Sequence, residues 1–119
     1  MTFTTIRDLL TWDPDDVCDW AVRLSGKEAG IAGWLKELAE ALSSRIELES
    51  AKWHAAEALF YMPTEAFANP DNRTATVAVI RGLVDLILKQ RCDEHTYRLA
   101  NQALVVVSKG FVDQPSLKA

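Results

Sequence analysis

Two glutamates, Glu37 and Glu40, have a spacing that could support metal chemistry. Side chains three residues apart lie on the same face of a helix, and carboxylate oxygens are preferred ligands of Mg²⁺ and Ca²⁺. A third carboxylate, Asp85, lies on another predicted helix and could complete such a site. Paired glutamates on an exposed helix otherwise form a solvated face. We adopt the solvated interpretation and predict no metal ligands.

The same pair resembles half of a known enzyme motif. Glu37-x-x-Glu40 is similar to the first half of the pattern in the MazG-type nucleotide pyrophosphohydrolases, all-α enzymes whose second helix carries Glu-x-x-Asp. The resemblance implies metal-dependent nucleotide hydrolysis with Glu37, Glu40 and Asp85 as ligands. The chain departs from the pattern because Gly82 stands three residues before Asp85, and Asp85 is farther from Glu40 than that family's pattern allows. This enzyme is kept as an alternative that requires the three carboxylates to converge.

Cysteine and histidine side chains give no complete site. Cys92 and His95 are spaced as metal ligands can be, but a zinc site needs three or four protein ligands and no second pair exists. Thiol catalysis would require Cys18 or Cys92 to meet His54 or His95 in space, and no local motif indicates either pair. No glycine-rich phosphate loop is present. We therefore predict no catalytic residues and no cofactor.

The strongest pattern is an acidic segment bracketed by two tryptophans. It comprises Trp12, Asp13, Asp15, Asp16, Asp19 and Trp20. Tryptophan is enriched at binding hot spots, and charges of one sign steer association with an oppositely charged partner. On a helix that begins here, the aspartates would face solvent, Val17 and Ala21 would face the core, and Trp20 would lie at the border. We predict that these six residues bind a protein with a basic surface; in the alternative, the tryptophans fill the core and the aspartates only cap and solvate the helix.

Charge is distributed unevenly along the chain. The 119 residues are 49% hydrophobic and 25% charged, with a net charge of -4. Residues 1–60 hold 11 acidic and 6 basic side chains, a net charge of -5, whereas residues 61–119 hold 6 acidic and 7 basic, a net charge of +1. A negative potential repels phosphate backbones, so we expect the acidic half to bind basic proteins and not DNA or RNA directly. A helix-turn-helix interpretation around Gly26 fails for the same reason.

Targeting signals are absent from the sequence pattern. The N-terminus has no basic region followed by an apolar run, and no apolar stretch is long enough to span a bilayer. We therefore expect a cytoplasmic protein that does not bind membranes. In that compartment Cys18 and Cys92 are expected to be free thiols.

Capping signals and apolar periodicity in the N-terminal half predict helices. We expect a short helix over residues 5–12 and a second one from Asp13-Pro14 to Ser25-Gly26. From Ile31 the helical pattern continues to about residue 62. One helix of that length would measure about 45 Å, more than so small a domain spans. We expect a break near Ser43-Ser44, or a helix that protrudes or takes part in a homodimer.

Core positions are predicted along with the remaining helices. Trp34 and Trp53 are expected to fill the core. One turn is expected around Phe67, and the helix from Thr74 or Thr76 to Arg91 is expected to be central because it is apolar on most sides. A last helix capped by Asp93 would use the seam Tyr97, Ala100, Leu104, Val107 and Phe111 and end at Gly110. The expected fold is all-α, a single-domain bundle of four to six helices over residues 1–111, with a flexible tail over 112–119.

A non-enzymatic protein-binding factor fits these observations best. The form we favour is a small acidic inhibitor or regulator that occludes a basic, nucleic-acid-binding surface of its target. In size and charge the chain resembles small acidic inhibitors of phages and mobile elements, including anti-CRISPR proteins. A helical subunit of a larger assembly is the alternative within the same class.

Overall fold

The computed structural model describes residues 13–44, 49–89 and 93–113, and within these ranges the chain is helical without strands. The α-helices are α2 (Pro14–Val22), α3 (Ile31–Ser43), α4 (Glu49–Tyr61), α5 (Glu65–Ala68), α6 (Arg73–Lys89) and α7 (Glu94–Val112), with a 3-10 turn, η1, at Pro70–Asn72. The predicted all-α bundle is confirmed. The helix expected over residues 5–12 lies outside the described residues, as do Trp12, Cys92 and residues 114–119 of the expected tail. Val112, the first residue of that expected tail, still belongs to α7.

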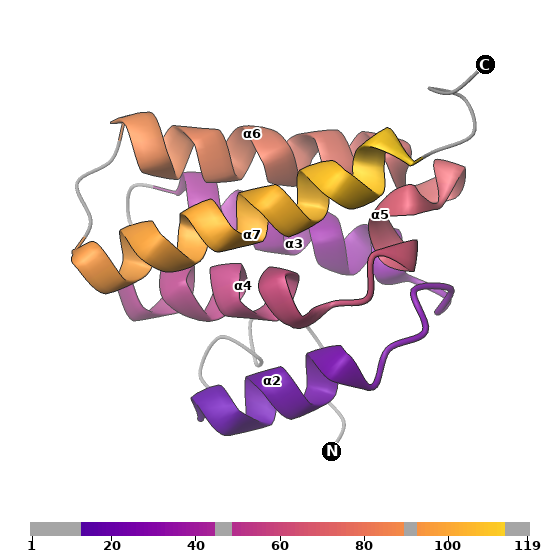
Figure 1. Ribbon diagram of the computed structural model, residues 1–119, viewed down its shortest axis with the longest axis horizontal. Coiled ribbons are helices and arrows are strands. Elements are labelled where there is room, and N and C mark those ends of the chain that lie inside the picture. The colour runs from indigo at the N-terminus through magenta and orange to yellow at the C-terminus, as the bar shows by residue number, and fades with distance from the viewer. Residues whose placement is uncertain (1–12, 45–48, 90–92, 114–119) are drawn as a thin grey trace.

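Four helices form a closed ring around the core. In this ring α3 packs against α4 and α6, and α7 packs against the same two helices from the other side (Figure 1). Helix α2 lies outside the ring against α4, and the short α5 packs against α7. Within the described residues the fold is therefore a four-helix bundle with two further helices, α2 and the short α5, outside the ring.

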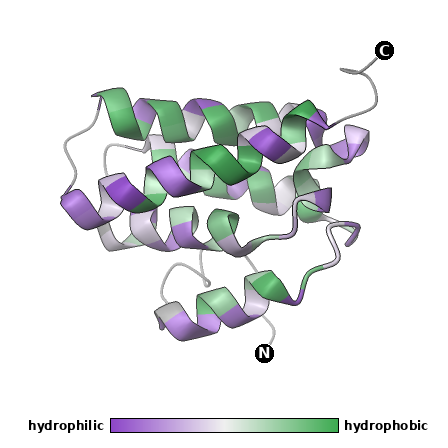
Figure 2. Cartoon of the chain, in the orientation of Figure 1, coloured by the Kyte–Doolittle hydropathy of each residue, from purple (hydrophilic) through white to green (hydrophobic). Residues whose placement is uncertain are grey.

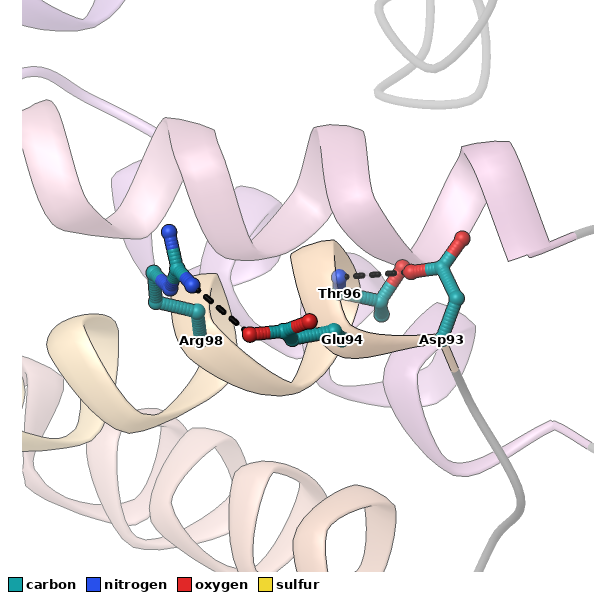
Figure 3. A network of polar contacts seen from close by, with 4 residues as sticks. All are labelled: Asp93, Glu94, Thr96 and Arg98. Atoms are coloured by element: carbon teal, nitrogen blue, oxygen red, sulfur yellow. Dashed lines mark hydrogen bonds and ion pairs between the residues drawn. The ribbon is translucent and has the colours of Figure 1, made fainter.

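Capping side chains fix the starts of α2 and α7 as predicted. Asp13 accepts a hydrogen bond from the Asp15 backbone N–H at 3.0 Å, and a proline follows it in the first turn. Asp93 accepts one from the Thr96 N–H at 2.8 Å (Figure 3). Each carboxylate satisfies a helix N–H that has no partner within its own helix and favours the positive end of the helix dipole.

The long apolar pattern after Ile31 is divided into two helices, as the length argument required. Helix α3 begins at Ile31, directly after Gly30, whose φ of +83° is the left-handed conformation that glycine adopts readily. It ends where the Ser44 N–H donates to the Glu40 carbonyl. Helix α4 follows from residue 49 and turns back alongside α3.

The core is filled by leucines and one phenylalanine, and not by tryptophan. The largest fully buried side chains are Phe67, Leu35, Leu38, Leu42, Leu59, Leu83, Leu86, Val17 and Val79. Trp34 is half-buried at the edge of this cluster, and Trp53 is half-buried as well. The prediction that these two tryptophans fill the core is therefore wrong. Smaller branched side chains interdigitate between four close helices more readily than an indole does.

Helix α6 is a member of the ring and not the central helix that its composition predicted. One stripe is buried, whereas Leu88 is 74% exposed and Ile80, Val84 and Ile87 are half-buried. Gly82 faces α3, where an added Cβ would lie 3.1 Å from the Ala39 carbonyl oxygen. This glycine lets the α3 and α6 backbones approach closely. Only one face of α6 lies in the core.

The buried stripe of α7 differs from the predicted seam. Ala100 and Val107 are buried as expected, but Tyr97 is exposed, and Leu104 and Phe111 are only half-buried. Small side chains take the inner positions instead: Thr96, Ala103 and Gly110. Gly110 lies within the helix, where an added Cβ would be 2.9 Å from the Phe67 Cβ, so it serves close packing and not helix termination.

Hydropathy follows this arrangement. Figure 2 shows hydrophobic and hydrophilic residues alternating along α2 and α7, as expected for helices with one face on a core. No helix in the described ranges combines the length and apolar character needed to cross a membrane.

Candidate functional site

The outer side of α2 gathers the aspartates that the sequence singled out. Asp13, Asp15, Asp16 and Asp19 are all exposed, and we call these four residues the acidic face. Val17 and Ala21, on the opposite side of the helix, are fully buried against the bundle. The inward and outward assignment made from the sequence is therefore confirmed, and α2 holds the four carboxylates on a fixed backbone.

One basic side chain lies beside the acidic face. Arg23 pairs with Asp19 at 3.2 Å, and both side chains are well exposed. Such a pair contributes little to stability because water screens it. Asp15 and Asp16 form no ion pair within the described part of the chain. Residues 13–23 carry four carboxylates against one guanidinium, so this surface keeps a strong negative potential.

Trp20 joins the acidic face to α3. It is half-buried and meets Trp34 edge to face, with ring centroids 5.6 Å apart and an interplanar angle of 62°. Edge-to-face packing is a preferred aromatic geometry and holds both rings in place. Trp34 was predicted as core and is instead the aromatic neighbour of the site. Trp12, the other predicted aromatic, lies outside the described residues.

The α4 side of α2 carries a polar cluster that sequence reasoning missed. The Cys18 thiol donates a hydrogen bond to Glu57 Oε1 at 3.1 Å, and the Tyr61 side chain interacts with the same sulfur. Burial, the hydrogen bond to Glu57 and the negative charge of that carboxylate raise the pKa of Cys18 to about 12. The nearby Cys18 sulfur, burial and Glu57 also raise the pKa of Tyr61.

At neutral pH this cluster therefore holds a neutral thiol. The thiolate is the nucleophile in cysteine chemistry, so Cys18 is unreactive in this setting. Cys18 is also a free cysteine, as expected, and its hydrogen bond goes to a carboxylate and not to a histidine. The cluster fastens α2 to α4 and adds a further carboxylate, Glu57, beside the acidic face.

The loop after α2 is fixed by backbone contacts. Glu28 accepts hydrogen bonds from the N–H groups of Ser25 and Gly26, at 2.7 and 2.9 Å. Partial burial of Glu28 opposes its ionisation, but these hydrogen bonds outweigh it and lower the pKa of the Glu28 carboxyl. Gly26, with φ of +89°, lies so close to α5 that a Cβ would be 2.6 Å from the Ala66 nitrogen. These contacts hold α2 in a defined position.

The carboxylates of the enzyme alternative do not converge. Among the described residues, which include Glu37, Glu40 and Asp85, no three histidine, cysteine or acidic side chains gather closely enough to hold a metal ion. A glutamate in place of Gly82 would meet the α3 backbone, so the missing half of the motif has no room in this packing.

The two histidines meet at Trp53. The Trp53 ring lies 4.4 Å from the His54 ring and 5.1 Å from the His95 ring, centroid to centroid. His54 is buried on α4, and His95 is exposed in the first turn of α7, so this cluster belongs to the α4–α7 contact. The long sequence separation explains why neither the Cys18–Glu57 pair nor this cluster was predicted.

Comparison with known proteins finds no family model that matches the chain, no similar curated protein and no similar solved structure.

Proposed function

We propose that this chain is a non-enzymatic protein-binding factor whose acidic face covers a basic surface of a target protein. The observation that carries the proposal is the placement of four exposed aspartates on one short helix, beside a half-buried tryptophan pair. Such a surface combines long-range attraction of a basic partner with a rigid aromatic anchor.

A target that binds nucleic acid is the form of this proposal we favour. Surfaces that bind phosphate backbones are rich in lysine and arginine, and a compact cluster of carboxylates offers them a competing negative charge. Occupation of that surface by α2 would exclude the nucleic acid and inhibit the target. This is the mode of action that size and charge suggest by analogy with small acidic inhibitors of phages and mobile elements, including anti-CRISPR proteins.

The alternative within the same class, a helical subunit of a larger assembly, is favoured by a different surface. The outer side of α7 exposes Tyr97, Val105 and Val112. Exposed apolar side chains on one helix are suited to contact with a neighbouring subunit. The two functions are separable because they use opposite ends of the sequence.

The test is capture of partners by the tagged chain from the cells that naturally produce it. Asp15, Asp16 and Asp19 are changed together to alanine, and a matched control removes three exposed carboxylates elsewhere: Glu65, Glu94 and Asp113. A partner held by the acidic face is lost from the first variant and retained by the second. The recovered partner should also bind nucleic acid less well when the unmodified chain is added. Equal capture by both variants would remove the acidic face from the function.

A further inference from the structure

A groove runs along the outer side of the α3–α6 contact, and nothing proposed above uses it. Three adjoining hollows of about 570, 530 and 330 Å³ share residues along it. The first and third have Lys36, Thr74 and Ala78 in common, and the first and second have Ser43 and Arg81 in common. The hollows are therefore parts of one continuous groove.

The largest of the three hollows has an apolar floor and a basic rim. Val77 and Ala78 of α6 are half-buried on the floor. Four charged side chains line this part: Lys36, Arg73, Arg81 and Glu40. Three basic residues against one acidic residue give this rim a local net charge of +2, in a chain whose total charge is -4. The other two hollows add Lys89, Asp71 and Asp85, so the whole groove has a net charge of +1.

The exposed side of α2 is complementary to this groove in charge and carries an apolar side chain. Its outer surface presents the acidic face with Arg23, four acidic residues and one basic, so its net charge is opposite in sign to that of the rim. Val22 is 55% exposed on the same side of α2, three residues after Asp19, and supplies an apolar side chain for the floor. A helix laid into a groove with complementary charges is a common mode of recognition.

We infer that the α3–α6 groove binds α2 of a second copy of this chain. Within one molecule α2 packs against α4, outside the ring, so the groove of the same chain is not its place. The contact joins two different surfaces. It forms a closed dimer when each copy places its α2 in the groove of the other, and an open oligomer when each copy binds a further one in the same direction. Self-association covers the acidic face and therefore competes with binding of the proposed partner. The inference shares that face with the proposed function and rests on it in no other way.

Charge reversal on each side of the contact tests the inference. One full-length variant carries Lys36→Glu and Arg81→Glu, and another carries Asp16→Lys and Asp19→Lys. All four side chains are exposed. Sedimentation velocity over a range of concentrations at low and high salt measures the association, and circular dichroism checks the helix content. A control with Arg98→Glu and Lys109→Glu makes, on α7, the same charge change as the groove variant.

The unmodified chain and the α7 control should associate at low salt and dissociate as salt is added. Each charge-reversed variant should associate at least about tenfold more weakly, since two exposed ion pairs become repulsive. An equimolar mixture of the two variants should associate again, because each supplies the surface that the other has inverted.

The inference is overturned by a monomeric unmodified chain under all these conditions, by variants that associate as it does, or by a mixture that stays monomeric. If charge reversal in the groove prevents folding, Lys36→Gln with Arg81→Gln replaces it and should weaken association in the same direction. Partner capture distinguishes this outcome from the proposed function. The groove variant keeps its acidic face, so it still captures a partner if that function is correct.

Discussion

The four-helix ring and the surface helix α2 are built from different interactions. In the ring, fully buried leucines meet between close backbones, and Gly82 permits the approach of α6 to α3. Phe67 of the short α5 adds to the same core and packs against Gly110 of α7. Helix α2 contributes only Val17 and Ala21 to the fully buried core and is otherwise fastened by Trp20 and the Cys18–Glu57 pair. The ring thus provides stability, and α2 is free to present charge.

The contrast explains where the acidic residues lie. Four carboxylates on a core helix would have to be desolvated, at a large cost in free energy. On α2 they remain hydrated, while Val17, Ala21, Trp20 and the Cys18–Glu57 pair attach the helix to the bundle. Substitutions in either region test this difference.

The largest effect on stability is expected in the buried core. Phe67→Ala removes a fully buried ring between α5 and α7 and should lower the free energy of unfolding by about 3–5 kcal/mol. Leu88→Ala, at a side chain that is 74% exposed on α6, should change it by less than about 0.5 kcal/mol. Urea unfolding followed by circular dichroism measures both. Similar losses would mean that the assigned core is wrong.

The polar attachment of α2 predicts an unreactive thiol. Raising the pKa of Cys18 from 9.0 to about 12 should slow its alkylation near pH 8 by about a thousandfold relative to the unfolded chain. The measurement uses a Cys92→Ser background, so that only one thiol reacts. Glu57→Gln should restore part of the rate by removing the negative charge. Fast alkylation of the folded chain would show that the cluster does not form.

The same cluster sets a pH dependence at the alkaline end. The folded chain holds the Cys18 proton more tightly than the unfolded chain does. Its contribution to stability is therefore complete below about pH 9 and is lost as the pH rises toward 12. Replacement of Cys18 by serine, whose hydroxyl does not titrate in this range, should reduce this alkaline loss.

Substitution of two glycines by alanine compares a closely packed position with an open one. Gly110→Ala places a Cβ 2.9 Å from Phe67 and should cost about 1–2 kcal/mol, since overpacking outweighs the gain in helix propensity. Gly33→Ala, on α3, meets nothing within 4 Å and should stabilise the chain by about 0.5–1 kcal/mol. Thermal unfolding compares the two. A stabilising Gly110→Ala would contradict the close contact of α7 with α5.

The smallest effect is expected in the loop that positions α2. Glu28→Gln weakens the hydrogen bonds to Ser25 and Gly26 and should cost about 0.5–1 kcal/mol. Because folding lowers the pKa of Glu28, its contribution is present above the usual carboxyl range and is lost as the pH falls through it. The free energies of unfolding of the unmodified chain and of Glu28→Gln, measured in urea, should therefore differ more near neutral pH than in acid. A constant difference would argue against an ionised Glu28 in this role.

Local signals were sufficient to predict most helix boundaries. The caps at Asp13 and Asp93, the start at Ile31 and the break near Ser43 each depend on a few adjacent residues. The rotation of α7 could not be predicted, because apolar periodicity favoured its large side chains as the seam. The fold instead places Ala103 and Gly110 inward, and Gly110 lies against the Phe67 side chain of α5.

Only part of the candidate site could be predicted from the sequence. The four aspartates lie within seven residues of the chain, so helical periodicity together with the apolar positions of Val17 and Ala21 predicts that they are exposed. Trp34 and Glu57 reach α2 from other helices, and Glu57 is 39 residues from Cys18. Contacts of that kind depend on how helices pack, which a single sequence does not encode locally.

The salt dependence of partner affinity tests the role of the acidic face most directly. The dissociation constant of the captured partner is measured at several salt concentrations, for the unmodified chain and for the chain with Asp15, Asp16 and Asp19 changed to alanine. If the acidic face makes the contact, the unmodified chain loses affinity steeply as salt rises, and the variant binds more weakly with a flatter dependence. Equal affinities with equal slopes would contradict this role.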